Sequence, residues 1–146
     1  MLVFFCASMG MLPVPLASAS CIGPQLVIGS DPTVATPSGE DPPPPVPVPR
    51  AGQVQVSGQW FHEGCDDSST AGAGCAGPLT TTQTPMEDVD LVLEQGASSW
   101  TLGVADAAGH AEDYAIGWRV RLPDEVMPGR AVLRAGGSKI DIQVEA

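Results

Sequence analysis

The sequence is poor in positive charge and contains no asparagine. Its 146 residues include 6 Lys and Arg against 17 Asp and Glu, which gives a formal net charge of −11. Binding of nucleic acid depends on clustered Lys and Arg side chains, so the composition argues against a nucleic-acid partner. The same shortage argues against binding an anionic membrane surface through a basic patch. Because Asn is absent, there is no Asn-x-Ser/Thr acceptor for a glycan.

Motifs of the common catalytic and nucleotide-binding sites are missing as well. No Gly-x-Ser-x-Gly elbow occurs, and only two His residues are available as general bases. Residues 72–77 match Gly-x-Gly-x-x-Gly, but Pro78 and a run of Thr follow where a phosphate site needs a helix. Asp88 and Asp90 lie two apart on one face of an expected strand, whereas glycosidase chemistry needs carboxylates from separate elements of a cleft. We therefore expect no catalysis and no cofactor.

The first twenty residues predict a secretory signal. Residues 1–20 contain no charged side chain, and an apolar run between Leu2 and Leu16 ends in small residues. Such a segment is too short, and too often interrupted by Pro, for a stable membrane span. A basic start is missing, since no Lys or Arg precedes Arg50, so either the true start lies upstream or the signal is weak.

Two cleavage sites fit the end of this segment. Ala17-Ser18-Ala19 matches a small-x-small site, and cleavage there frees Ser20 as the new terminus. The run that ends at Cys21 resembles a bacterial lipobox, after which the cysteine is acylated, although Ser18 replaces the usual Leu.

Counting the cysteines favours the second site. Cys65 and Cys75 lie close enough in the sequence to pair, and a disulfide between them would contribute about 3 kcal/mol by constraining the unfolded loop. Cys6 leaves with the signal, so Cys21 is then left alone in an oxidising compartment, where a free thiol is unusual. Acylation accounts for it, so we expect a lipid anchor at Cys21 on the outer surface of the cell membrane, with secretion as the alternative.

Residues 30–50 are dominated by proline. Pro has no N–H and a fixed φ, so this stretch is excluded from a helix or a central strand. We interpret it as an extended spacer or a long surface loop. The short apolar run Leu26-Val27-Ile28 before it could be a first edge strand, and the Pro-rich stretch is then a loop within the fold.

From residue 53 onward, apolar and polar side chains alternate repeatedly, which is typical of strands with one buried face. Gly136-Gly137 joins two such runs and predicts a tight hairpin. Helical spacing is not evident anywhere. Six strands, or seven with the run at residues 26–28, predict an all-β, antiparallel sandwich. The inward positions we expect include all three Trp residues and are Val54, Val56, Trp60, Val89, Leu91, Leu93, Trp100, Leu102, Val104, Tyr114, Ile116, Trp118, Val120, Leu122, Ala131, Leu133, Ala135, Ile140, Ile142 and Val144.

Several segments resemble a known family. Residues 53–61, with the pattern Val-x-Val-x-Gly, are similar to the second strand of bacterial immunoglobulin-like domains of the IPT type. Cys21-Ile22-Gly23-Pro24 resembles the start of the mature chain in small surface lipoproteins of high-GC bacteria. The resemblance implies an immunoglobulin-like β-sandwich of about seven strands in the cell envelope, and it implies no activity.

One group of residues is a candidate cation site. His62, Glu63, Asp66 and Asp67 could bind a divalent cation together with His110 or Asp113, and a solvated acidic loop is the alternative interpretation.

The sequence thus predicts a signal peptide at residues 1–20, an edge strand and Pro-rich segment at residues 21–52, and the sandwich at residues 53–146. We expect a structural or binding module whose partner is an envelope protein or a cell-wall component. The alternative function is divalent-cation binding by the acidic disulfide loop.

Overall fold

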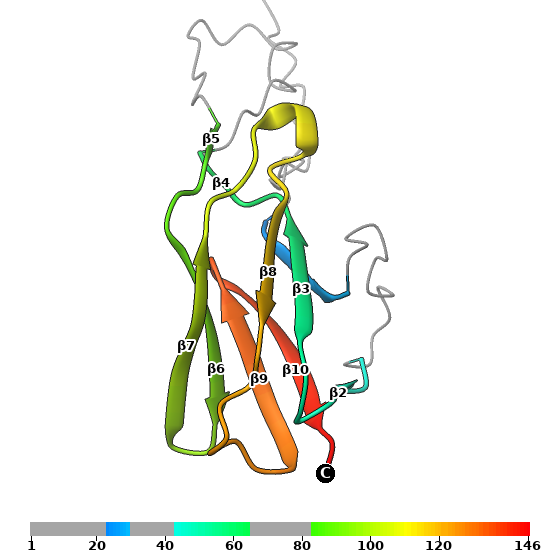
Figure 1. Ribbon diagram of the computed structural model, residues 1–146. Helices are drawn as coiled ribbons and strands as arrows, with labels where there is room; N and C mark the ends of the chain where they lie inside the picture. Colours follow the sequence, from blue (N-terminus) through cyan, green and yellow to red (C-terminus); the bar gives the residue numbers. More distant parts are fainter. Residues whose placement is uncertain (1–22, 30–42, 65–82) are drawn as a thin grey trace, which may run out of the picture.

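The computed structural model describes residues 23–29, 43–64 and 83–146, and this part of the chain is all-β, as the alternation predicts (Figure 1). One 3-10 helix, η2, interrupts the strands, and the described residues contain no helix with the length and apolar character needed to cross a membrane. The strands are β1 (Gln25–Ile28), β2 (Val46–Val48), β3 (Val54–Gln59), β4 (His62–Glu63), β5 (Thr84–Pro85), β6 (Val89–Gln95), β7 (Ser98–Ala105), β8 (Ile116–Val120), β9 (Gly129–Ala135) and β10 (Ser138–Val144); η2 is His110–Glu112.

The described strands form two main sheets and one short ribbon. One sheet has the order β1-β3-β8, the other has the order β2-β10-β9-β6-β7, and β4 pairs with β5 alone. The pairing is antiparallel in every ladder except β2–β10, which is parallel. The five-stranded sheet is therefore mixed, whereas the alternation predicts antiparallel pairing alone.

A single apolar core joins the two main sheets. Every second residue of the long strands points into it, because successive side chains of a strand alternate between faces. Both sheets contribute, since the cluster includes Val56 and Trp118 from the three-stranded sheet and Leu91, Leu133 and Ile142 from the five-stranded sheet. The predicted inward set is confirmed for β8, β9 and β10, although Ile140 is only partly buried.

Two predicted core positions are wrong. Trp60 lies outside the core cluster, because its backbone takes a left-handed conformation (φ 63°) that ends the alternation of β3, and Phe61 is fully buried instead. Val104 is 56% exposed, because a bulge between Leu91 and Val92 shifts its register against β6. Of the other two Trp residues, Trp118 is buried and Trp100 is half-buried against the core.

The edge strand expected at residues 26–28 is present as β1, which pairs with β3. The end of the Pro-rich segment forms β2, with Pro47 at its centre. Pro47 has no N–H to donate, and it is compatible with this position because β2 is the outermost strand of its sheet. The backbone of an outermost strand forms hydrogen bonds to a neighbouring strand on one side only. The hairpin expected at Gly136-Gly137 is also present, and both residues have positive φ, as a primed turn requires.

Candidate functional site

The predicted cation ligands are only partly within the described residues. His62 and Glu63 form β4, which pairs with Pro85 and Thr84 of β5 at one end of the molecule. The other predicted site residues, which are Asp66, Asp67, the Cys65–Cys75 pair and the lipidation site Cys21, lie outside the described residues.

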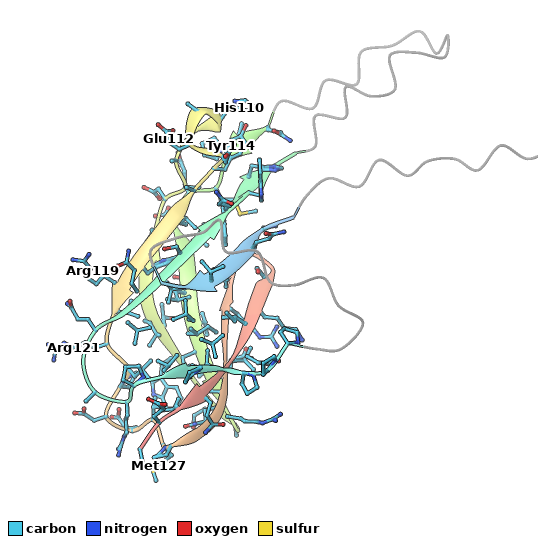
Figure 2. All side chains as sticks on the ribbon, turned by 90° about the vertical axis from the view of Figure 1, so that its right-hand side faces the viewer. His110, Glu112, Tyr114, Arg119, Arg121 and Met127 are labelled. Carbon is cyan, nitrogen blue, oxygen red and sulfur yellow. The ribbon has the colours of Figure 1, made fainter. Side chains whose placement is uncertain are left out.

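Both His residues of the chain pack against its single Tyr. The ring centroid of Tyr114 lies 4.8 Å from that of His62 and 5.9 Å from that of His110. Tyr114 is 3% exposed, and its hydroxyl lies 3.4 Å from Oε1 of Gln83. Nδ1 of His62 lies 3.0 Å from the carbonyl oxygen of Gly64, so this ring nitrogen has a local partner. We call these three rings the apical cluster; Figure 2 labels two of its members, His110 and Tyr114, at one end of the fold.

An unusual backbone holds the apical cluster. Trp60, Asp113 and Tyr114 all have positive φ, a conformation that costs a residue with a Cβ roughly 1 kcal/mol or more. The backbone N–H groups of Trp60 and Phe61 donate to the carbonyl oxygens of Asp113 (3.0 Å) and Tyr114 (3.2 Å). These bonds fix residues 60–61 against residues 113–114, and they bring His62 next to Tyr114 although the two are far apart in the sequence.

The end of the fold that contains the apical cluster is acidic. Residues 60–64, 83–88 and 106–115 contain no Lys or Arg, and their carboxylates are Glu63, Glu87, Asp88, Asp106, Glu112 and Asp113. Even so, no three His, Cys, Asp or Glu side chains of the described ranges converge as metal ligands would. The predicted set is therefore represented here only by His62 and Glu63, and the described part of the chain does not bring His110 or Asp113 into a ligand group with them.

A hollow lies on the outer face of the five-stranded sheet. Its volume is about 630 Å³, which is within the range of ligand-binding clefts. One wall is the proline run before β2, and the floor comes from three adjacent strands. We call it the proline groove; its lining consists of Pro43, Pro44, Pro45, Glu94, Gln95, Gly96, Arg130, Ala131, Val132, Asp141 and Ile142.

Charges of both signs line the proline groove and its surroundings. Glu94, Arg130 and Asp141 are part of the lining. Glu94 also accepts a 2.6 Å hydrogen bond from Nε of Arg134, and both side chains of this ion pair are exposed. A smaller hollow of about 230 Å³ continues on the far side of this pair, over Val92 and the Gly136-Gly137 turn. The outer face therefore offers donors and acceptors beside apolar proline rings.

Comparisons of the chain with protein-family models, with curated proteins and with solved structures give no match.

Sequence reasoning missed both the apical cluster and the proline groove. His62, His110 and Tyr114 were visible as rare residues, but nothing local indicated that they meet. The sequence predicts that the proline run is extended, but not where it lies. Its end pairs in parallel with β10, which places the run beside the outer face, and the paired residues, such as Val46 and Ile142, are far apart in the sequence. The one usable signal was the pair of valines, Val46 and Val48, within the proline run.

Proposed function

We propose that the protein is an exported, non-catalytic module of the cell envelope. In this proposal it is an immunoglobulin-like sandwich, held to the membrane by a lipid on Cys21, that binds a protein partner through the proline groove. The observation that carries the binding role is the groove itself, because it has the volume of a ligand-binding cleft and combines apolar walls with charges of both signs.

The strand order supports an immunoglobulin-like topology. In that fold, strands A, B and E share one sheet, and strands C, F and G form the other. The order β1-β3-β8 corresponds to A-B-E, and β10-β9-β6 corresponds to G-F-C with β7 in the place of C′. These seven strands equal the number that the family resemblance implies.

The chemistry of the proline groove supports a polypeptide partner. Arg130 and Asp141 lie in the groove with no salt bridge to another described residue, so a partner that offers both signs of charge can pair with them. Proline rings present a rigid apolar surface that loses little side-chain entropy on binding. A polypeptide segment has this combination of apolar and charged groups.

Site-specific crosslinking in cells tests the binding role. A photoreactive benzophenone side chain at Val132, in the groove, should yield a discrete crosslinked protein. The same group at Gln55, on the exposed face of β3 in the other sheet, is the matched control and should yield none. Arg130→Glu should reduce the Val132 crosslink by about tenfold, as the loss of one charge-assisted contact predicts. Equal crosslinking from both positions, or none from Val132, would contradict the proposal.

The N-terminus of the mature protein tests the location. Mass spectrometry of the membrane fraction should find an acylated Cys21 as the first residue, and Cys21→Ser should move the protein to the medium. An unmodified chain that begins at Ser20 would instead favour the secreted alternative.

A further inference from the structure

The edges of the two main sheets differ in how well they are protected against pairing with another strand. An edge strand exposes unpaired N–H and C=O groups, and proteins block such edges with short strands, Pro, charged side chains or bulges. Three of the four edges are short or carry Pro or charged side chains, and the fourth, β7, has only a bulge. β1 has four residues, β2 has Pro47 at its centre, and β8 carries Arg119 with Arg121 just beyond it. Figure 2 shows both arginines projecting away from the fold.

The fourth edge, β7, has neither charge nor proline along its length. It is the longest of the described strands and lies at the border of the five-stranded sheet (Figure 1). Ser98, Ser99, Thr101 and Val104 are exposed, and no charged residue occurs between Gln95 and Asp106. This neutral stretch stands out in a chain with a formal charge of −11.

A bulge divides β7 into two halves. The register runs without interruption from Ser98 to Thr101, and Leu102 has no partner on β6. Beyond the bulge, Gly103 lies against β8, since a Cβ there would be 3.4 Å from Cγ1 of Val120 and 3.5 Å from Cδ1 of Trp118. The half before the bulge is Ser98–Thr101.

The direction of the backbone groups in this half follows from its turn. Gly96 and Ala97 form a two-residue hairpin turn, so Gln95 and Ser98 are the hydrogen-bonded pair that closes it. Every second residue of an antiparallel strand then turns its N–H and C=O away from the partner. Those residues are Ser99 and Thr101, and no backbone bond joins either of them to a described residue outside the sheet.

We propose that a second copy of this chain pairs with β7, antiparallel and centred on Trp100. A two-fold axis at Trp100 sets Ser99 of one copy opposite Thr101 of the other, twice, and each pair exchanges two backbone hydrogen bonds. The two half-buried Trp100 side chains then face each other on the inner side of the joined sheet, which is a favourable cross-strand aromatic pair. An interface across a two-fold axis uses the same surface of both copies and is therefore self-complementary. Dimers with this symmetry are the commonest homo-oligomers.

The electrostatics of the edge favour a second copy over a basic partner strand. Ser99, Thr101 and Val104 are the exposed side chains on the outer face, and none offers a carboxylate to a Lys or Arg. The acids paired with Val104 and Ser99, Asp90 and Glu94, are on β6, one strand further from the axis. Two chains that each have a formal net charge of −11 still repel each other at long range, which opposes pairing. Salt screens this repulsion, and the Debye length is about 10 Å at 0.1 M. Association should therefore strengthen as NaCl is raised from about 20 mM to about 500 mM.

Sedimentation equilibrium of residues 22–146, which retain every described residue, tests this pairing. The wild-type chain should show a monomer–dimer equilibrium, and its Trp fluorescence should change with concentration as Trp100 is covered. Ser99→Lys/Thr101→Lys sets like charges opposite each other at both pairs and should weaken the dimer by about tenfold. Ser99→Lys/Thr101→Glu sets opposite charges there and should retain or tighten it.

The two double variants share the first substitution, so a loss caused by Lys at position 99 alone would affect both. Gln55→Lys, on the exposed face of the other sheet, adds one positive charge far from β7 and should not weaken the dimer. A wild-type chain that stays monomeric at every salt concentration, or equal weakening by both double variants, would overturn the proposal. A monomer whose β7 pairs with a strand of a different protein would overturn it as well.

Discussion

At Trp60 the backbone enters the left-handed region, and this single conformation decides which aromatic ring occupies the core. If the alternation of Val54, Val56 and Gly58 continued, Trp60 would point inward, but the turn brings Phe61 there instead. The Phe61 ring packs edge-to-face on Trp118, with centroids 5.9 Å apart and planes at 73°. The ring occupies a slot between Gly58 and Gly136, where a Cβ on either glycine would overlap it. The core at this point depends on glycines that sequence patterning treats as turn or spacer residues.

We expect Gly58→Ala to destabilise the fold by about 3 kcal/mol, because the added Cβ would meet the Phe61 ring and the backbone oxygen of Gln25 (2.8 Å). Urea unfolding measures the change, and the m-value should stay constant. Gly117→Ala is the matched control in the neighbouring strand, since the nearest heavy atom to its Cβ would be the Val56 oxygen at 3.9 Å. The control should be neutral or up to about 1 kcal/mol stabilising. Equal losses in both variants would refute the steric explanation.

Among the elements, the connection between β8 and β9 shows how a segment without regular structure is fixed. The side-chain amide of Gln95, at the end of β6, bonds to both backbone groups of Met127. Its Nε2 donates to the carbonyl oxygen at 2.8 Å, and its Oε1 accepts from the N–H at 2.9 Å. The Met127 side chain is 61% exposed, so the backbone bonds hold this residue, while the buried Leu122 and Val126 hold the rest of the connection against the core. The β6–β7 and β8–β9 connections thereby act as one unit at the end of the fold away from the apical cluster (Figure 2).

Gln95→Ala should cost about 1 kcal/mol, because its two hydrogen bonds to the backbone of Met127 are lost at an exposed site. Amide hydrogen exchange gives the sharper measurement, since the N–H of Met127 should lose its protection while the N–H groups of β9 keep theirs. Gln55→Ala serves as the control, because no side-chain hydrogen bond of Gln55 is present among the described residues. Unchanged protection at Met127 would show that the amide does not hold the connection.

On the scale of the whole molecule, charge is distributed unevenly. The end that contains the apical cluster has carboxylates and two His residues but no Lys or Arg in its described segments, whereas Arg130, Arg134 and Lys139 all lie on β9 and β10. Arg134 and Lys139 are direct cross-strand neighbours, and the ion pair with Glu94 offsets their repulsion. The acidic end and the mixed outer face thus suit different partners, and our proposal assigns binding to the outer face.

The alternative function, divalent-cation binding, is tested by thermal unfolding. We expect the same melting temperature in EDTA and in 1 mM CaCl₂ or ZnCl₂ at matched ionic strength, because no three candidate ligands converge among the residues that the structure describes. Ionic strength must be matched, since the screening of repulsion among its own carboxylates already stabilises a chain with a formal net charge of −11. A real site at 100 times its Kd would add about 2.7 kcal/mol of stability. A rise of that size that Asp66→Asn/Asp67→Asn abolishes would replace our proposal with the alternative.

The sequence by itself determined the all-β class, most of the core and the Gly136-Gly137 hairpin. The physical reason is that alternation of side chains and the φ of turn residues are local properties, which neighbouring residues fix. The tertiary structure decided which aromatic ring fills the slot near Gly58, how β7 bulges, and where the proline run lies. Those features depend on contacts between distant segments, such as Phe61 with Gly136 and Val46 with Ile142, and alternation contains no information about them.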